Sequence, residues 1–211
     1  MLIEKKSHNP MSNISFSFPF FQLLMTQIFH DIISPMSALS TGISFLCSLE
    51  KNGKSIHEEA SLLALVDTAR QQLQHRVVFF RTLVGRQENF SQEERLKEII
   101  GYITEHNVSI EKAPEAFPGG VFTILCCWLC RQFSGASSIE STSHIKGGWT
   151  FIARGTPRKA EHSDDLIIME GNPPHHPQES YAYYLHYLAK KEGLSVKIQR
   201  SSQAISISFS P

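Results

Sequence analysis

The 211-residue sequence has no excess of charge of either sign. Lysine and arginine together number 20, aspartate and glutamate also number 20, and the formal net charge is therefore zero. A general nucleic-acid binder draws its affinity from surplus positive charge, so this balance argues against nucleic acid as a partner. Hydrophobic residues make up 41% of the chain, enough to build a buried core.

Cysteine and glycine patterns exclude further classes of site. Three of the four cysteines lie in one apolar run, so a disulfide framework is not expected: Cys47, Cys126, Cys127 and Cys130. Buried free thiols are the preferred interpretation, the alternative being a metal site built from the three clustered thiols. Free thiols indicate a reducing compartment, and we expect a cytoplasmic protein without a metal. No Gly-x-Gly occurs, so phosphate loops and dinucleotide sites are absent.

Two uncharged segments resemble membrane signals only superficially. Residues 14–29 are broken by Pro19 and lack a small-residue cleavage site. Residues 32–49 reach the threshold length for a spanning helix, but six of these 18 residues are Ser or Thr. The same segment also contains Pro35 and Gly42. We therefore expect no membrane span.

A heptad pattern begins at Phe21. Apolar or small residues recur in alternating steps of four and three, at positions 21, 25, 28, 32, 35, 39, 42, 46 and 49. Asn52 and Gly53 break this pattern, and Ser55 with Glu58 forms a capping box for a second helix. That helix repeats the spacing at positions 63, 66, 69, 73, 77, 80 and 84, and Gly85 is a plausible end. The two helices predict an antiparallel hairpin.

A single hairpin leaves one apolar stripe on each helix uncovered. Pairing two copies into a four-helix bundle would bury both stripes, so a homodimer is expected. The alternative is that the second half of the chain covers the stripe. The heptad spacing favours the dimer.

The second half of the chain predicts an α+β fold, with helices over a mostly antiparallel sheet. Residues 119–133 read as an apolar helix, and residues 180–192 read as a helix that stops at Gly193. Residues 98–110 are ambiguous between helix and strand. The expected strands are residues 138–145, 149–154, 166–169, 194–199 and 204–209.

His30 is the residue best placed for chemistry. With Ile28 at heptad position d and Ile32 at a, His30 falls at f and points away from the bundle core. An exposed imidazole suits a phosphoryl carrier, because a phosphorylated aspartate must reach a ring nitrogen in line. The neighbouring Asp31 can hold the other ring N–H and fix the tautomer. Pro35 removes an amide donor one turn beyond. The alternative is an ordinary solvated His-Asp pair.

The surface beside His30 is unusually bare. Small residues occupy the outward positions where an exposed helix normally carries charge: Ser34, Ser37, Ala38, Thr41 and Ser44. Such a strip lets a partner's helix approach closely, the alternative being that the second domain packs on it. Arg76 and Arg81 in the second helix can steer an acidic partner. The alternative is that these arginines simply lie on a solvated helix face and bind no partner.

Three segments carry a family resemblance. Residues 29–35, Phe-His-Asp-Ile-Ile-Ser-Pro, resemble the H-box of sensor histidine kinases, and more closely that of the ChpT family of histidine phosphotransferases. Residues 76–85, Arg-Val-Val-Phe-Phe-Arg-Thr-Leu-Val-Gly, are similar to the end of that family's second helix. Residues 181–194 resemble its last helix and strand. The resemblance covers about residues 20–210.

Residues 1–13 are polar and unpatterned and are expected to be disordered. For the rest of the chain the resemblance implies a phosphorelay intermediate, with a dimerisation and phosphotransfer hairpin (14–87) and a degenerate histidine-kinase-type ATP-binding domain (88–211). The family accepts a phosphoryl group from the receiver of a hybrid histidine kinase (CckA-like) and passes it to response-regulator receivers (CtrA/CpdR-like). His30 matches the phosphoacceptor, and its matching neighbours are Asp31, Ser34 and Pro35. The expected receiver contacts are Ser37, Ala38, Thr41, Arg76 and Arg81, with Mg²⁺ supplied by the receiver.

The second half distinguishes a kinase from a carrier. A working kinase domain of this type needs an Asn on its central helix for Mg²⁺, an Asp-x-Gly for adenine and a glycine-rich lid. Residues 119–133 contain no Asn and no acid, and residues 169–174 read Met-Glu-Gly-Asn-Pro-Pro. We therefore expect a phosphotransferase that binds no ATP and needs no cofactor of its own. The rival interpretation is a non-catalytic dimeric scaffold or inhibitor of a two-component kinase.

Overall fold

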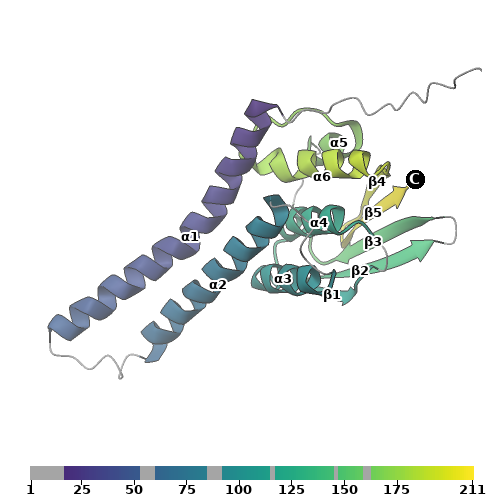
Figure 1. Ribbon diagram of the computed structural model, residues 1–211. Coiled ribbons are helices and arrows are strands. Elements are labelled where there is room, and N and C mark those ends of the chain that lie inside the picture. Colours follow the sequence, from purple (N-terminus) through teal and green to yellow (C-terminus); the bar gives the residue numbers. More distant parts are fainter. Residues whose placement is uncertain (1–16, 53–59, 85–91, 115–116, 145–146, 159–162) are drawn as a thin grey trace, which may run out of the picture.

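The computed structural model describes residues 17–52, 60–84, 92–114, 117–144, 147–158 and 163–211. Two long helices, α1 (Phe18–Lys51) and α2 (Ala60–Val84), pack side by side as an antiparallel hairpin (Figure 1). The hairpin projects away from the rest of the chain. The expected N-terminal segment 1–13, the capping box at Ser55 and Glu58, and the helix end at Gly85 lie outside the described residues.

From Ile28 onward the predicted heptad seam is the face that α1 buries, whereas Phe21, where the pattern was expected to begin, is exposed and Phe20 and Leu24 are buried in its place. Every seventh residue along it is buried, while the alternate seam positions 32, 39 and 46 are half-buried; the buried set is Ile28, Pro35, Gly42 and Leu49. At Gly42 the two helices approach so closely that a Cβ atom would lie 2.5 Å from Cγ2 of Val66 on α2. The seam is therefore used largely within the hairpin itself.

The second part of the chain is a layer of helices on a five-stranded sheet (Figure 1). Along the sheet the strands run in the order β1-β2-β3-β5-β4, with β1 and β2 parallel and the other neighbours antiparallel. This confirms the predicted α+β fold class. The helices are α3 (Gln92–Glu105), α4 (Gly119–Gln132), α5 (Ser163–Glu170), η3 (Pro177–Glu179) and α6 (Ser180–Lys191); the strands are β1 (Val108–Lys112), β2 (Ser137–His144), β3 (Gly148–Arg154), β4 (Ser195–Arg200) and β5 (Ala204–Ser210).

Helix α4 is the centre of the core. It is apolar around almost its whole circumference because α3, α6 and the sheet surround it, and a helix buried on all sides needs no polar face. On the sheet, Phe151, Ile205 and Ile207 point into this core at every second position. Cys126, Cys127 and Cys130 are fully enclosed here, and burial raises the pKa of their thiols, as expected of inert packing residues.

Local chemistry corrects two sequence expectations. Residues 166–169 are not a strand but part of α5, whose first turn carries Asp164 and Asp165, and acidic side chains stabilise a helix N-terminus. The ambiguous residues 98–110 divide between α3 and β1 at Asn107, which adopts a φ of 57°. The predicted stop at Gly193 agrees with the structure, since its φ of 72° ends α6.

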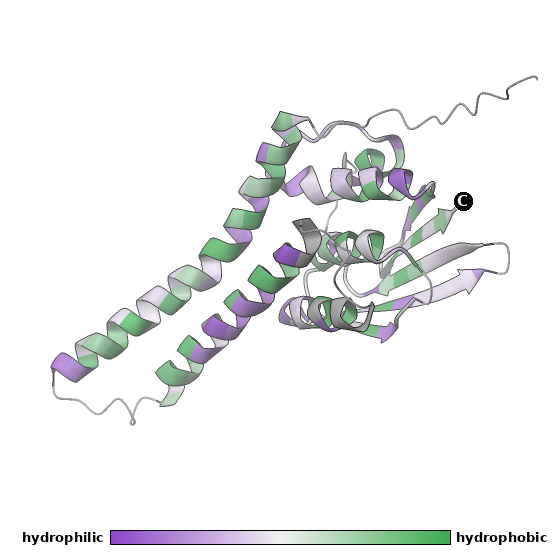
Figure 2. Ribbon diagram, viewed as in Figure 1, coloured by the Kyte–Doolittle hydropathy of each residue, from purple (hydrophilic) through white to green (hydrophobic). Residues whose placement is uncertain are grey.

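The first turns of α1 belong to the core of the second part. Phe20 is buried, with its ring 4.9 Å from that of Tyr183 and 6.1 Å from that of Tyr184 on α6. Further along, α1 keeps an exposed apolar row: Phe29, Ile33, Met36 and Ile43. Figure 2 shows that hydrophobic residues recur along much of this helix. By length and composition alone α1 is also apolar enough to cross a membrane, a test that core helices and N-terminal signal sequences pass as well.

The close approach at Gly42 generates a stability prediction. Gly42→Ala should lower the free energy of unfolding, because the new methyl group collides with Val66 across the hairpin. The matched control is Gly101→Ala in α3, where the nearest atom, Cδ2 of His75, lies 3.5 Å from the added Cβ. The control should gain up to about 1 kcal/mol from helix propensity. Chemical denaturation at one protein concentration measures both; stabilisation by Gly42→Ala would contradict the packing.

Candidate functional site

His30 lies near the junction of the hairpin and the second part. Its side chain is 81% exposed, in agreement with heptad position f. The Nδ1 atom lies 3.5 Å from Oδ1 of Asp31, so it is the ring nitrogen that faces this carboxylate. When Nδ1 of a neutral imidazole carries the proton, the lone pair lies on Nε2, which is the state that a nucleophilic histidine needs.

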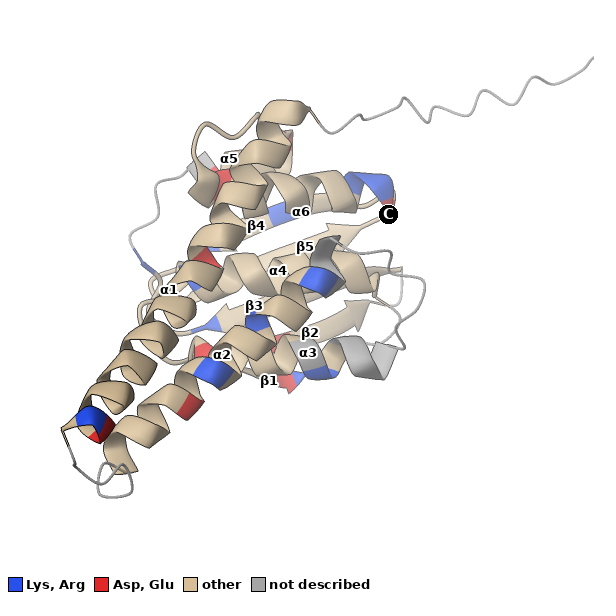
Figure 3. Cartoon of the chain, turned by 60° about the vertical axis from the view of Figure 1, so that its left-hand side comes forward, with Lys and Arg blue, Asp and Glu red and all other residues tan. Residues whose placement is uncertain are grey.

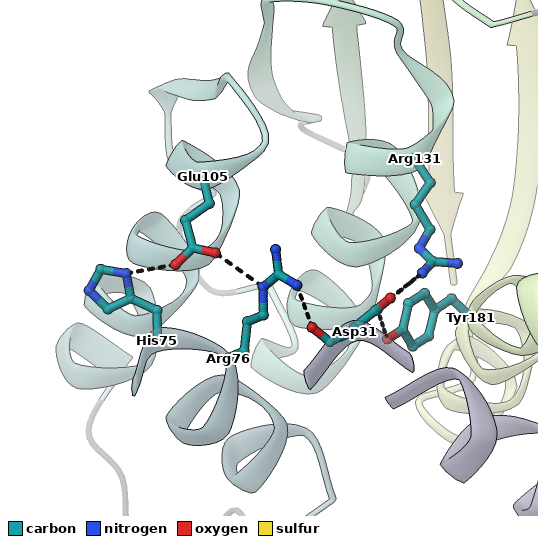
Figure 4. A network of polar contacts seen from close by, with 6 residues as sticks. All are labelled: Asp31, His75, Arg76, Glu105, Arg131 and Tyr181. Atoms are coloured by element: carbon teal, nitrogen blue, oxygen red, sulfur yellow. Dashed lines mark hydrogen bonds and ion pairs between the residues drawn. The ribbon is translucent and has the colours of Figure 1, made fainter. Parts of the chain in front are cut away.

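The Asp31 carboxylate faces the second part of the chain. Its side chain is only 12% exposed. It accepts hydrogen bonds from Nη2 of Arg131 at 2.9 and 3.0 Å and from the Tyr181 hydroxyl at 3.1 Å (Figure 4). Nε2 of Gln27, one turn earlier on α1, also donates to it at 2.9 Å. The sequence predicted that Asp31 orients His30. The structure adds that α4 and α6 hold the same carboxylate.

The backbone of Asp31 is bound as well, and Pro35 explains why. A helical carbonyl normally accepts the N–H four residues later, but residue 35 is proline and has no N–H. Nη1 of Arg76 on α2 donates to the Asp31 carbonyl oxygen instead. The same guanidinium donates from Nε to Oε2 of Glu105 at 3.2 Å, and Nδ1 of His75 lies 3.0 Å from Oε1 of that carboxylate.

Together these contacts form a clamp between the hairpin and the helices behind it. We define the clamp as Asp31, Arg76, Glu105, Arg131 and Tyr181. Burial opposes the charge on Arg131, but the Asp31 carboxylate and the smaller contributions of Tyr181 and Tyr102 together outweigh it, so the arginine pKa is raised. The guanidinium also lies over the Tyr181 ring, 4.8 Å from its centroid. Burial raises the pKa of Glu105, against the effect of its hydrogen bonds from Arg76 and His75.

The predicted receiver contacts divide into two groups. Ser34, Ser37, Ala38 and Thr41 are exposed on α1, within a stretch that carries no charge between Asp31 and the tip of the hairpin (Figure 3). Arg81 is exposed on α2. Arg76 is different, because only 14% of its side chain is exposed and its Nε and Nη1 atoms donate within the clamp. Arg76 therefore faces the inside of the molecule and not a partner.

Sequence reasoning missed the partners of Asp31. Arg131 and Tyr181 stand 100 and 150 residues away along the chain. One signal was available, since Arg131 is the single charged residue in the apolar run 119–133. A lone charge on a buried helix needs a counter-ion. Tyr181 gave no such signal and read as packing among the other tyrosines of α6.

A cleft of about 720 Å³ opens between α1, the end of α4 and η3. His30 lines it together with His106, Arg131, Arg158 and the acids Asp164 and Glu179. A kinase-type nucleotide-binding domain needs an Asn on this helix for its metal, whereas α4 lines the cleft with Trp128, Arg131 and Gln132. Trp128 and Gln132 each donate a hydrogen bond of 3.1 Å to Asp164.

Comparisons with solved structures identify the fold. A bacterial phosphotransferase, known from a 1.7 Å structure, superimposes with a TM-score of 0.72 at 18% sequence identity, over 93% of this chain and 98% of that one. Two histidine kinases also match. AdeS of Acinetobacter baumannii has a TM-score of 0.39 at 12% identity, over 85% and 95% of the two chains. The blue-light activated kinase EL346 of Erythrobacter litoralis has a TM-score of 0.37 at 12% identity, over 86% and 58%.

No family model matches the chain, and no curated protein matches it. The similarity to the phosphotransferase therefore shows a shared fold at low sequence identity.

The clamp generates a second prediction. Arg131→Met should lower the free energy of unfolding by about 3 kcal/mol, because it leaves the Asp31 carboxylate buried without its cation. The control is Arg154→Met, which removes an exposed arginine whose ion pair with Glu140 spans 3.4 Å and should cost less than about 1 kcal/mol. Urea denaturation followed by circular dichroism measures both. Equal effects of the two substitutions on the free energy of unfolding would show that the Arg131–Asp31 pair stabilises the fold no more than an exposed ion pair does.

Proposed function

We propose that this chain is a histidine phosphotransferase that carries a phosphoryl group on Nε2 of His30. In the proposed step Nε2 attacks the phosphorus of a receiver's aspartyl phosphate. The N–P bond forms as the P–O bond to the aspartate breaks, and the aspartate leaves as a carboxylate. The reverse step on a second receiver returns His30 to its neutral form. The observation that carries this proposal is an exposed imidazole whose Nδ1 faces a fixed carboxylate.

The surroundings of His30 support transfer between proteins. An incoming receiver needs a close approach, and the exposed strip from Ser34 to Thr41 offers small side chains and no charge. The clamp holds the His30–Asp31 segment in one orientation, so the ring nitrogen need not be ordered anew for each partner. Under this proposal the donor is the receiver of a hybrid histidine kinase and the acceptors are response regulators, which bring the Mg²⁺.

ATP has no place in the proposed reaction. Helix α4 carries no residue that could hold a nucleotide's metal, and Asp164, which lines the cleft, accepts hydrogen bonds from the chain itself. Burial raises the pKa of Asp164, which weakens it further as a cation ligand. The phosphoryl group then comes from another protein, and the reaction takes place in the cytoplasm.

A homodimer is part of the proposal. The heptad seam is buried against α2 and the first turns of α1 pack on α6, so neither needs a second chain. The exposed row Phe29, Ile33, Met36 and Ile43 repeats at helical spacing beside the seam. A second copy of the hairpin would cover this row and complete a four-helix bundle.

The phosphoacceptor assignment predicts the outcome of a single substitution. His30→Ala should abolish acceptance of phosphate from a phosphorylated receiver and leave the fold unchanged, because the side chain is 81% exposed. The matched control is His144→Ala, which removes another exposed histidine, on β2, and should accept phosphate normally. Acid-labile, base-stable radiolabel on the protein is the measurement. Labelling of the His30→Ala variant would place the carrier elsewhere, and an unlabelled wild type would favour the scaffold.

The docking strip predicts a second substitution. Ala38→Arg should slow the rate of phosphotransfer at least tenfold, because a bulky charged side chain at an exposed position two turns from His30 obstructs a partner's helix. Ser48→Arg, on the same face about 15 Å farther along the helix, is the control and should transfer normally. Transfer and dimer mass are measured on one preparation of each variant. Normal transfer by Ala38→Arg would mean that the receiver approaches from another side.

A further inference from the structure

The chain itself supplies four hydrogen bonds to the Asp31 carboxylate. Nε2 of Gln27 donates to Oδ1 at 2.9 Å. Nη2 of Arg131 donates to both carboxylate oxygens, at 2.9 and 3.0 Å, and the Tyr181 hydroxyl donates to Oδ2 at 3.1 Å (Figure 4). A carboxylate offers about four lone-pair positions, so these bonds use its accepting capacity. His30 is left with the longest contact, 3.5 Å from Nδ1 to Oδ1.

The donors to this carboxylate are side chains with little freedom to move. Gln27 and Tyr181 are buried, and only 25% of the Arg131 side chain is exposed. The Arg131 guanidinium also lies over the Tyr181 ring, which restrains it further. His30, in contrast, lies almost entirely in solvent. The orientation of the carboxylate is therefore set by the buried side, and the exposed imidazole contacts an anion that is already bound.

Arg131 is the cation whose charge offsets that of Asp31. Arg76 also faces Asp31, but it binds the backbone carbonyl, and its own charge is paired with Glu105 at 3.2 Å. Four further ionisable groups act on Asp31 and are neutral at pH 7, because burial raises the pKa of the phenols and the thiol and lowers that of the imidazole: Tyr102, Tyr181, Cys127 and His106. In the described part of the chain, the other titratable or charged residues that line the cleft with His30 form no ion pair with Asp31: Cys130, Arg158, Asp164, His176 and Glu179.

We propose that Arg131, supported by Tyr181, is a positioning residue that keeps His30 nucleophilic by offsetting the charge of Asp31. This inference rests on the proposed function of His30. An anion beside an imidazole favours the imidazolium, in which both ring nitrogens carry protons and Nε2 cannot attack phosphorus. With its charge offset, Asp31 orients Nδ1 without stabilising that protonated form. The two contacts in series keep the guanidinium within roughly 6 Å of Nδ1, where a unit charge at an effective dielectric constant of about 40 changes an ionisation by about one pH unit before salt screening.

The test follows the pH dependence of His30 in the full chain by two measurements. NMR records the ring signals of His30 across a pH titration, with His30→Ala used to assign them. Phosphoramidate, a small phosphoryl donor, measures how fast His30 is phosphorylated at each pH, with His30→Ala as the blank. In this reaction the bond from Nε2 to phosphorus forms as the bond to the departing ammonia breaks. The pH dependence of phosphoramidate itself is common to all variants.

Four substitutions separate charge from structure. Arg131→Gln should raise the midpoint of both pH profiles by at least about half a pH unit, because the Asp31 carboxylate loses its cation. Tyr181→Phe removes one neutral donor and should raise both midpoints by less. Arg131→Lys keeps the charge and should restore the wild-type midpoints. The control Arg154→Gln removes an exposed arginine of β3 that pairs with Glu140, and should behave like the wild type.

A purely structural role for Arg131 would lower the phosphorylation rate at every pH and leave the midpoints in place. Unchanged midpoints in Arg131→Gln therefore overturn the inference. If that variant does not fold, unchanged midpoints in Tyr181→Phe overturn it instead. An equal shift in Arg131→Lys and Arg131→Gln also overturns it, because charge would then not be the cause. Both measurements work without a receiver, whereas the proposed function fails separately, if no phosphorylated receiver labels the wild type.

Discussion

The arrangement of this molecule depends on Asp31 being held through both its side chain and its backbone. The carboxylate meets Arg131 and Tyr181, and the carbonyl meets Arg76, so one residue joins α1 to α4, α6 and α2 (Figure 4). Most of this contact is shielded from water, where an ion pair is screened little by salt. The backbone that carries His30 is therefore held in place although the His30 side chain itself is exposed.

The sequence predicted the hairpin well because heptad spacing is a local signal. Seam residues such as Ile28 and Leu49, and the outward His30, follow from periodicity along one helix. The α+β class and the end of α6 at Gly193 followed from equally local patterns. Residues 166–169 were predicted wrongly because four apolar residues show no period; the acids at the start of α5 were the better signal.

The clamp and the cleft could not be predicted from short stretches of the sequence, because their residues are far apart along the chain. Arg131 acts through a contact with Asp31 from 100 residues further along the chain, and no spacing rule connects the two. Arg76 makes the same point, since the sequence of α2 alone gives no sign of its contact with Glu105 on α3. Interactions that depend on tertiary packing override what each helix suggests alone.

Pro35 has a consequence for the rotational phase of α1. Successive helical residues turn by about 100°, so a slight rotation of the whole helix would carry His30 away from the cleft and the strip away from a partner. A continuous helix offers a neighbouring helix no free carbonyl to hold against such rotation. Pro35 leaves the Asp31 carbonyl without a partner in α1, and Arg76 on α2 donates to it instead. This hydrogen bond fixes the rotation of α1 about its own axis at the turn where the histidine must face outward.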